Sequence, residues 1–301
     1  GITATNFQQI GASASFGTFT NDSDGLGPSR VPISDGVIFV TGTATSAVNP
    51  LGNTIDFQGF GGGVSTGSAA PVNEPDLNAL SGFAGIYDAA GFDFDFTSAT
   101  DRVGFIFSFA SDEYPEFTGT IFNDAFGFFI HGGTEYTATT NLALVPDTNL
   151  GISVNSINNG IRGTAAALNP TYPAPFDATH TDLFISNSIY SGDHTVGPYL
   201  QYDGLTVMLT VDADITRNTT YDMKIAIGDA GDNGWDSAVF FKTQGFLSLT
   251  SATDNAYATT EDLAASGNVI TDDTGKNIDI TPAGNQAGIT VIGVNGAPLG
   301  T

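Results

Sequence analysis

The sequence predicts an all-β protein: an antiparallel β-sandwich or jelly roll with at most one or two short helices, plus a short C-terminal β extension. Three observations predict this class. Apolar and polar side chains alternate in several short runs, and 38 glycines recur between apolar runs as turns do between strands. The chain contains 23 Phe and 9 Tyr, which favour strands. It shows no βαβ rhythm, so a parallel sheet is not expected.

Four segments carry the strand pattern most clearly. In residues 91–97, three phenylalanines alternate with Asp93 and Asp95. Residues 102–110, 206–215 and 221–227 place every second apolar side chain on one face. We expect four half-buried strands, and the inward-facing residues of the last three are Val103, Phe105, Phe107 and Phe109, then Val207, Leu209 and Val211, then Tyr221, Met223, Ile225 and Ile227.

The best helix signal covers residues 74–86. Pro75 suits a first helical turn, and Leu77, Leu80 and Phe83 have helical spacing. We expect one short helix here, which does not change the fold class.

The composition changes near residue 250. Beyond Phe246 the chain becomes rich in Thr, Ala and Asp, and one more apolar, strand-like stretch follows at 289–294. We therefore place a β-sandwich domain at 1–250 and an extension at 251–301. About 50 residues are few for an independent sandwich, so the extension is expected to be a linker or the first part of a longer repeat.

The charge balance limits the possible partners. The chain has 32 Asp+Glu and 7 Lys+Arg, for a formal charge of −25. This excess of negative charge disfavours nucleic acid and anionic lipid as partners. The carboxylates repel one another unless a positive group lies among them, and few basic side chains exist to do this. A metal ion is the expected counter-charge, and oxygen ligands favour calcium.

Two absences narrow the chemistry further. Without cysteine, disulfides, thiolate catalysis and sulfur-ligated zinc are excluded. No run approaches the roughly 18 apolar residues of a membrane helix, so direct membrane insertion is not expected. The sequence opens at Gly1 without a signal peptide, and we expect a mature product or an excised fragment.

Two acidic loops between Phe-rich strands are the candidate calcium sites. Closely spaced carboxylates and amides on Gly-containing loops can supply the six to eight oxygens that calcium takes. Neither loop has the EF-hand pattern, and the same residue types also form ordinary turns. The expected ligands are Asp112, Glu113, Glu116, Asn123 and Asp124 in residues 111–124, and Asp229, Asp232, Asn233 and Asp236 in residues 229–237.

Aromatic residues in these loops are open to two interpretations. Trp235, the only tryptophan, lies between Gly234 and Asp236. It either packs on the rim of the sandwich or forms a binding platform beside the metal, and Tyr114 and Phe117 are open to the same alternatives. In the binding interpretation Tyr114, Trp235 and Asp236 contact a ligand that completes the calcium coordination.

Other acidic segments are weaker candidates. Residues 21–25 form either a third calcium loop or a plain turn. At the expected domain boundary, a calcium ion would stiffen the linker, and without one the Thr-rich segment is a flexible hinge. The interdomain ligands in question are Asp254, Asn255, Glu261 and Asp262.

Catalysis has less support than binding. His131, His180 and His194 have no motif around them. A glycosidase needs two carboxyl groups, one with a raised pKa, and Asp112, Glu113 and Asp236 are the available candidates. Carboxylates that coordinate calcium stay ionised and cannot act as the acid. We therefore predict no catalytic residues and no enzyme, with a glycoside hydrolase as the less favoured alternative.

Several motifs in order and at matching spacing resemble the choice-of-anchor L domain. The early segments are SDGVIFVTGTATSAVNPLGN (34–53) and EPDLNALSG (74–82). The longest is FIFSFASDEYPEFTGTIFNDAFGFFIHG (105–132). The remaining motifs are NLALVP (141–146), VNSINNG (154–160), QYDGLTVMLTV (201–211) and IAIGDAGDNGWDSAVFF (225–241). The resemblance spans nearly all of residues 1–250. It implies a large secreted or surface-anchored bacterial protein, similar to the ligand-binding regions of calcium-dependent adhesins of the RTX type that act in biofilms.

The C-terminal residues 253–301 resemble the opening of a cadherin-like or VCBS-type repeat, which implies neighbouring repeats in a longer chain. Together the two resemblances imply a calcium-dependent adhesin module in the extracellular space. Its expected ligand is a peptide, or less favourably a glycan, on another cell or surface. A structural spacer or surface-assembly unit with calcium as a staple is the alternative.

Overall fold

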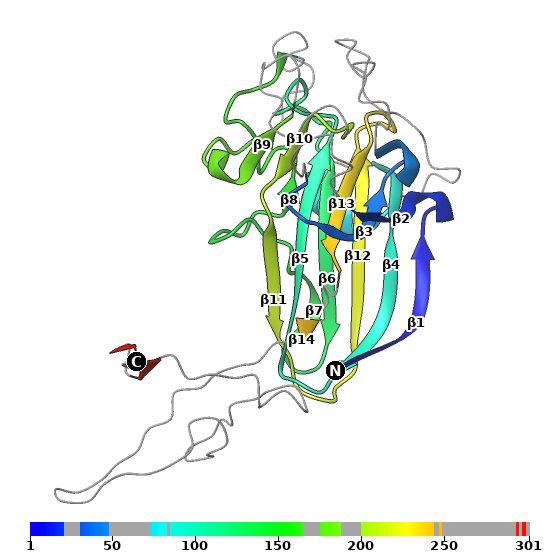
Figure 1. The fold of residues 1–301 in the computed structure, drawn as a ribbon. Coiled ribbons are helices and arrows are strands. Elements are labelled where there is room, and N and C mark those ends of the chain that lie inside the picture. Colours follow the sequence, from blue (N-terminus) through cyan, green and yellow to red (C-terminus); the bar gives the residue numbers. More distant parts are fainter. Residues whose placement is uncertain are drawn as a thin grey trace, which may run out of the picture.

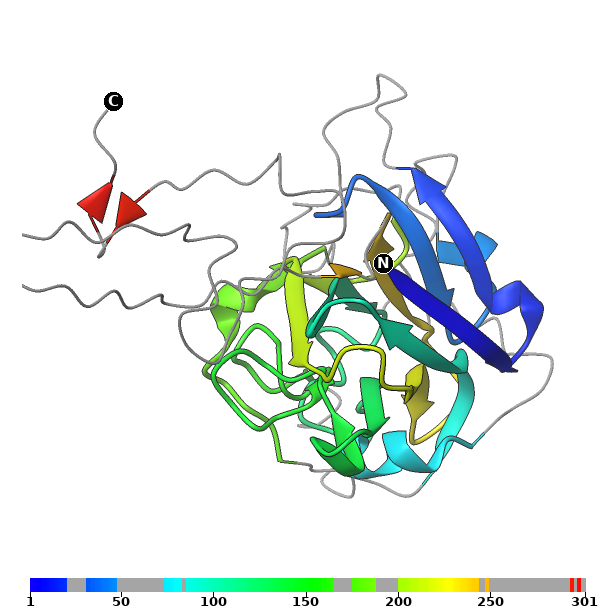
Figure 2. The same cartoon turned by 90° about the horizontal axis from the view of Figure 1, so that it is seen from below.

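A computed structural model describes residues 1–20, 31–47, 73–82, 85–164, 175–187 and 200–243, and the backbone of 247–248, 293–294 and 297–298. Two antiparallel sheets pack against each other in this part of the chain, as the view along the strands shows (Figures 1 and 2). The predicted all-β sandwich is confirmed.

The first sheet has six strands in the order β1-β4-β12-β6-β7, and β8 pairs with β6. The long central strands place Tyr221 of β12 between Phe96 and Gly132. The strands are β1 (Ile2–Ile10), β4 (Ile86–Ser98), β6 (Ala125–Gly132), β7 (Tyr136–Asn141), β8 (Ile152–Ser153) and β12 (Tyr221–Ala230).

The second sheet has eight strands in the order β2-β3-β13-β5-β10-β9, and β11 and β14 also pair with β5. Its strands are β2 (Phe16–Thr20), β3 (Asp35–Val40), β5 (Arg102–Ser111), β9 (Phe184–Ser186), β10 (Gly204–Thr206), β11 (Leu209–Asp214), β13 (Ser237–Lys242) and β14 (Leu247–Ser248). In the C-terminal extension, β15 (Gly293–Val294) and β16 (Ala297–Pro298) form a separate antiparallel pair.

The core lies between the two sheets and is built from phenylalanines. The rings of Phe105 and Phe128 are 4.0 Å apart between centroids, and those of Phe107 and Phe126 are 4.9 Å apart. Each pair joins β5 of one sheet to β6 of the other. Ten of the eleven inward-facing residues expected from the sequence are buried, and Val207 is partly buried. Removing such rings from water is the main driving force for this packing.

The prediction of one continuous strand at residues 206–215 is wrong. Residues 206–215 form the end of β10 and all of β11, with an interruption at Val207 and Met208. Leu205 lies opposite Ala110 and Leu209 opposite Phe107, so this segment has one residue more than its partner strand. The extra residue breaks the ladder as a β-bulge does, and the N–H of Val207 instead donates to the carbonyl of Leu183 at 2.8 Å.

The predicted helix is shorter than expected. Helix α1 spans Pro75–Ser81, and Ile86, expected at its end, instead begins β4. Gly82 ends the helix because it adopts the left-handed conformation at φ 76°, which glycine reaches without strain. Three short 3-10 turns complete the described elements: η1 (Ser13–Ser15), η2 (Ala44–Ala47) and η3 (Thr181–Leu183).

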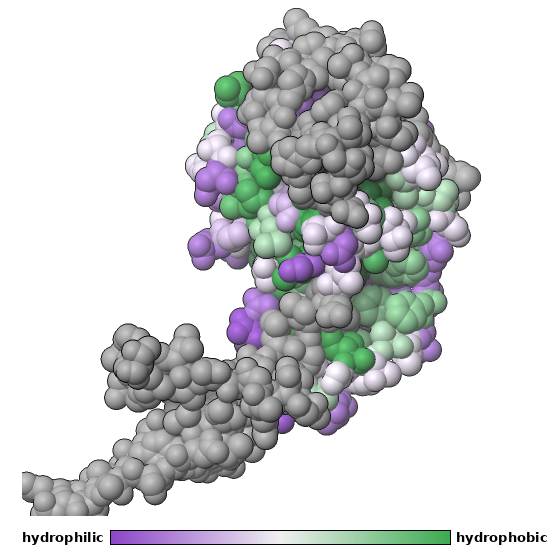
Figure 3. Space-filling view, in the orientation of Figure 1, coloured by the Kyte–Doolittle hydropathy of each residue, from purple (hydrophilic) through white to green (hydrophobic). Residues whose placement is uncertain are grey.

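The described surface is mixed in character. On the face drawn in Figure 3, hydrophobic residues lie among hydrophilic ones over the coloured atoms. The large exposed apolar side chains come from separate elements and loops, and they are Phe7, Val37, Tyr87, Leu150, Ile161 and Met208. Scattered apolar residues of this kind are usual for a protein surface.

Candidate functional site: a buried acidic cluster and an adjacent cavity

Both acidic loops join the two sheets at the same end of the sandwich. The first loop leads from β5 to β6, and the second leads from β12 to β13. Antiparallel pairing sets Ser237 opposite Ser111 and Ala125 opposite Gly228. The carboxylates that follow or precede these residues therefore meet at the upper end of the molecule in Figure 1, away from the N-terminus.

The carboxylates at this end are buried. Glu113 and Asp124 have no exposed surface, and Asp229 is 1% exposed. Asp112 and Asp236 are also buried, and the N–H of Asp112 donates to the carbonyl of Asp236 at 3.2 Å. We call these five residues the acidic cluster.

Asp124 is fixed by hydrogen bonds from both loops. Its Oδ1 accepts from the N–H of Ala230 at 2.9 Å, and its Oδ2 accepts from Ser237 Oγ at 2.6 Å and from Ser111 Oγ at 3.5 Å. This side chain thus ties β12 and β13 to the start of β6. Fixed donors of this kind favour an ionised carboxylate.

Glu113 and Asp229 differ sharply from Asp124. No hydrogen bond of standard geometry reaches either oxygen of Glu113 or of Asp229. Thr41 is near enough to Asp229 for a side-chain hydrogen-bond interaction that lowers the pKa of that carboxyl. Its hydroxyl, however, accepts from the N–H of Ser237 at 2.9 Å and donates to the carbonyl of Ser237. Buried polar groups in proteins are normally paired, so two unpaired carboxylates in one place need an explanation.

The cluster resists ionisation when it holds no cation. Burial raises the pKa of Glu113 well above its usual value, and the charges of Asp124, Asp232, Asp229 and Asp112 raise it further. Burial raises the pKa of Asp229 in the same way, helped by Asp124. Burial also raises the pKa of Asp124 to about 7, although Ser237 and Ala230 oppose this.

No basic side chain of the described residues pairs with Glu113, Asp124 or Asp229. The ion pairs that Lys and Arg form among the described residues lie elsewhere: Arg102 pairs with Asp212 and Asp214, and Lys224 pairs with Glu74 and Asp76. The chain has few Lys and Arg, and at this site the buried carboxylates have no basic partner among the described residues.

The cluster fits calcium in its chemistry, although its side chains do not yet converge. It offers only oxygen ligands, which calcium prefers, and two of its carboxylates are unpaired. Within the described ranges, however, no three or more Asp, Glu, His or Cys side chains are arranged so that they could hold a metal ion as they stand. Side chains would have to turn toward an ion for the cluster to bind it.

The remaining predicted metal ligands lie around the cluster in different settings. Glu116 and Asp232 are partly exposed, and the Oδ1 of Asp232 accepts from the N–H of Gly234 at 2.8 Å within its own turn. Asn233 is exposed. Asn123 is buried, and both ends of its amide bind backbone, with Nδ2 donating to the Ser81 carbonyl and Oδ1 accepting from the N–H of Asn155.

The aromatic residues that were predicted to contact a ligand lie in different environments. Tyr114 has no exposed surface, and its hydroxyl donates to the carbonyl of Ile157 at 2.6 Å. In this position it is a core residue that cannot offer its ring to a ligand. Trp235 is partly exposed and lies 4.3 Å from Phe117 between ring centroids. This contact corresponds to the rim interpretation, and Phe117 itself is buried.

Several predicted residues lie outside the described ranges. They are the loop 21–25, His194, and the interdomain candidates Asp254, Asn255, Glu261 and Asp262. Of the other two histidines, His131 is exposed on β6, and His180 Nδ1 lies 3.6 Å from Asp177 Oδ1.

Sequence reasoning missed the residues that complete the site from other parts of the chain. Asp88 is buried in β4 and its charge raises the pKa of Asp229. Thr41 and Ser237 bridge β3 and β13 beside the cluster. An acidic residue in the largely apolar first part of β4, residues 86–92, is the one signal that could have indicated Asp88.

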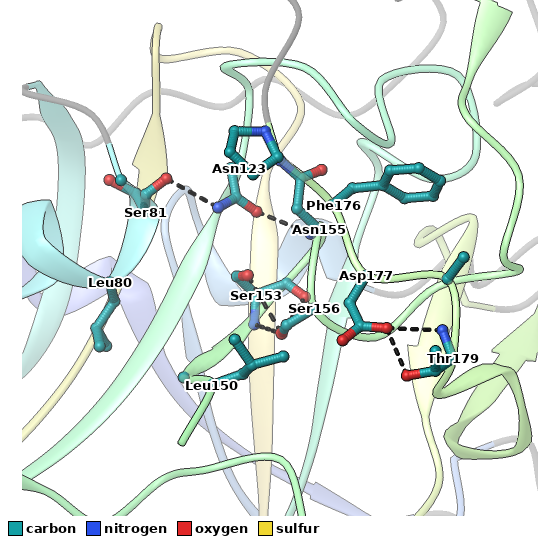
Figure 4. A pocket seen from close by; sticks show the side chains of 14 residues that line it. Leu80, Ser81, Asn123, Leu150, Ser153, Asn155, Ser156, Phe176, Asp177 and Thr179 are labelled. Atoms are coloured by element: carbon teal, nitrogen blue, oxygen red, sulfur yellow. Dashed lines mark hydrogen bonds between the residues drawn. The ribbon is translucent and has the colours of Figure 1, made fainter. Parts of the chain in front are cut away.

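A cavity of about 570 Å³ lies beside the cluster (Figure 4). Asn123, which precedes Asp124 in the chain, is one of its lining residues. Its walls come from the end of α1, from residues 150–156 around β8, and from residues 175–179. The lining residues are Leu80, Ser81, Gly82, Asn123, Leu150, Gly151, Ser153, Asn155, Ser156, Pro175, Phe176, Asp177, Ala178 and Thr179.

Comparison with known proteins identifies one family. Residues 1–247 match the choice-of-anchor L domain, and this match does not include the C-terminal repeat predicted from the sequence. Searches of curated proteins and of solved structures found no match. Among the helices of the described ranges, none combines the length and apolar character needed to span a bilayer. Because the match covers most of its length, the chain belongs to the choice-of-anchor L domain family, whose members are modules of extracellular surface proteins.

Proposed function

We propose that the chain is a non-catalytic, calcium-dependent binding module of a secreted bacterial adhesin, in which calcium acts as a buried clamp between the two sheets. The observation that carries this proposal is the pair of unpaired carboxylates, Glu113 and Asp229, enclosed between the sheets without a counter-charge. Glu113 follows a strand of one sheet, and Asp229 lies on a strand of the other.

The free energy of the ionised cluster supports a bound cation. An ionised carboxylate that is buried without a partner is strongly disfavoured, so it either takes up a proton or binds a positive ion. Calcium accepts several oxygens in flexible geometry. Glu113, Asp229 and Asp124 would hold it, with Asp112 and Asp236 beside them. The ion would supply a positive charge to carboxylates that pair with no Lys or Arg side chain of the described residues.

Burial of the cluster supports a clamp more than an open binding site. A calcium ion that presents a free coordination position to a ligand needs access from solvent, and the three central carboxylates have almost none. The same burial argues against the glycosidase alternative. All three of its candidates, Asp112, Glu113 and Asp236, are buried, so a sugar cannot reach them.

The ligand-binding part of the proposal is supported by the family and by the cavity. Choice-of-anchor L domains belong to extracellular surface proteins, where recognition of another cell or surface is a common task. A pure spacer has no need for a preformed cavity of ligand size, whereas a binding module does. A peptide is the proposed ligand, with a glycan as the less favoured one, and neighbouring repeats of a longer chain are the proposed stalk.

Thermal unfolding of the full chain with calcium and after chelation tests the clamp. At calcium concentrations about 1,000 times the dissociation constant, binding stabilises a protein by roughly 4 kcal/mol, which corresponds to a rise in melting temperature of about 10 °C for a domain of this size. We expect a rise of this order in the wild type.

The variant Glu113→Gln gives the sharper test because we expect it to maintain or raise stability without calcium and to lower stability, relative to wild type, with calcium. Without calcium it replaces a carboxyl that is costly to ionise and leaves the protein equally or more stable, while with calcium it loses most of the rise. Asp222→Asn is the matched control, because Asp222 is exposed on β12 about 23 Å along the strand from Asp229. An identical calcium response in wild type and Glu113→Gln would reject the proposed site.

A further inference from the structure

Among the described residues that line the cavity beside the acidic cluster, Asp177 is the one with an ionisable side chain. Oδ1 of Asp177 accepts from the N–H of Thr179 at 2.7 Å and from Thr179 Oγ1 at 2.5 Å. These hydrogen bonds lower the pKa of Asp177, so the group is ionised at neutral pH. Figure 4 shows the second oxygen turned away from Thr179, on the side of Ser156.

The amide and hydroxyl groups of Asn155 and Ser156 in the wall already have hydrogen-bond partners within the protein. Asn155 Oδ1 accepts from the N–H of Gly119 at 2.6 Å, and its Nδ2 donates to the carbonyl of Thr120 at 2.9 Å. Ser156 Oγ accepts from the N–H of Ser153 and donates to the Ser153 carbonyl. Together with the two bonds of Asn123, this pairing makes a preformed wall that offers few free donors to an anion.

Apolar groups complete the enclosure. Leu80 of α1 and Leu150 lie on one side of the cavity, and Phe176 lies on the other (Figure 4). Arg162 packs over the Phe176 ring, 4.5 Å from its centroid, and its Nη1 donates to the Gly119 carbonyl at 2.8 Å. This guanidinium is therefore directed to the protein's own backbone and is not among the lining residues.

We infer that this cavity binds an aliphatic ammonium group, such as the side chain of a lysine in a partner peptide. The ammonium pairs with the free oxygen of Asp177, and the methylene groups pack against Leu80, Leu150 and Phe176. A volume of about 570 Å³ accommodates a lysine side chain together with peptide backbone on either side, and it lies in the range of ligand sites. No Lys or Arg lines the cavity among the described residues, and the formal charge of −25 favours the approach of a cation.

This inference rests on the proposed binding function, but not on the calcium clamp. It names the chemistry of the ligand and moves the binding site from the calcium ligands to the cavity next to them. The link between the two is Asn123 and Asp124, because the Asp124 carbonyl accepts from the N–H of Val154 in the cavity wall at 3.1 Å.

Titration of the calcium-loaded full chain with three capped peptides tests the inference. The peptides are identical except for a central lysine, norleucine or glutamate, and binding is followed by calorimetry and by NMR shifts. We expect the lysine peptide to bind at least about tenfold more tightly than the norleucine peptide, because the charge-assisted hydrogen bond is lost in the latter. The glutamate peptide is expected not to bind.

Two variants and one control locate the site. Asp177→Asn retains an oxygen that can accept from Thr179, so it preserves the local turn while it removes the charge, and it should weaken lysine-peptide binding about tenfold. Leu150→Ala trims a side chain that is 40% exposed and should weaken binding of both the lysine and norleucine peptides. Asp222→Asn carries the same change in net charge at the opposite end of β12 and should leave the affinity unchanged.

Equal affinity for the lysine and norleucine peptides, or unchanged lysine binding in Asp177→Asn, overturns the inference. Absence of any binding by a protein that still shows the calcium-dependent rise in melting temperature rejects the cavity as the site and leaves the clamp intact. Selective lysine binding by a protein that shows no calcium-dependent rise in melting temperature rejects the clamp and leaves the cavity as the binding site.

Discussion

Hydrogen-bond partners decide what each residue at the acidic end of the sandwich does. Tyr114 and Trp235 are both aromatic residues in acidic loops, yet Tyr114 lies in the core and donates to Ile157, whereas Trp235 packs at the rim on Phe117. Asp124 and Glu113 are equally buried, yet only Asp124 has donors. The unpaired side chain is the one that needs an external partner.

The core role of Tyr114 gives a prediction at this scale. Tyr114→Phe leaves the Ile157 carbonyl without its donor, and we expect it to cost about 1–2 kcal/mol of unfolding free energy, or a few degrees in melting temperature. Lysine-peptide affinity should not change. Tyr87→Phe is the control, since Tyr87 is 40% exposed. A loss of peptide affinity in Tyr114→Phe without a loss of stability would return Tyr114 to the binding site.

Helix α1 is held on the first sheet by Lys224 as well as by apolar contacts. Lys224 Nζ donates to Glu74 Oε1 at 3.0 Å and to Asp76 Oδ2 at 2.6 Å, and both acceptors lie at the start of the helix. Burial lowers the pKa of Lys224, but the hydrogen bonds with Asp76 and Glu74 outweigh it and raise the pKa overall. The helix also supplies Leu80, Ser81 and Gly82 to the cavity.

Replacement of this lysine should therefore loosen α1. We expect Lys224→Met to destabilise the protein by about 1–3 kcal/mol, because Glu74 remains buried without its partner. The double variant Lys224→Met/Glu74→Gln should recover part of this loss, and Lys242→Met, at an exposed position, is the control. Chemical denaturation measures all three. If Lys224→Met is no less stable than Lys242→Met, the ion pairs do not hold the helix.

Over the whole molecule, the acidic cluster makes stability depend on pH when metal is removed. The pKa of Asp124 rises from 3.8 to about 7 on folding, and those of Glu113 and Asp229 rise as well. The folded protein then holds more protons than the unfolded chain. The resulting stabilisation is complete below about pH 4 and is lost as the pH rises through about 7.

We therefore expect the melting temperature of metal-stripped protein to fall between pH 5 and pH 8. Glu113→Gln should reduce this slope because it removes one of the titrating groups, and saturating calcium should remove most of it because the carboxylates are then ionised on the ion. Asp147→Asn, at an exposed position, should keep the wild-type slope. A melting temperature that rises with pH in the metal-stripped wild type contradicts the assignment of these carboxyls as a buried, unpaired group.

The sequence predicted the class of the fold, the inward faces of the main strands and the two acidic loops, because strand alternation and turn composition are local signals. It missed the break at Val207, which depends on the register against β5, and the early end of α1 at Gly82. The contribution of Asp88 and Thr41 to the cluster, and the whole cavity, depend on pairing between distant segments. The burial of Tyr114 likewise follows from packing that no local pattern encodes.

A crystal structure of the full chain grown with ample calcium is the decisive test of the calcium clamp. We expect anomalous density for an ion between the sheets, bound by Glu113 and Asp229 with Asp124, and side chains turned toward it relative to their present positions. Well-ordered Glu113 and Asp229 carboxyls with no ion between them, in crystals soaked in calcium, would contradict it.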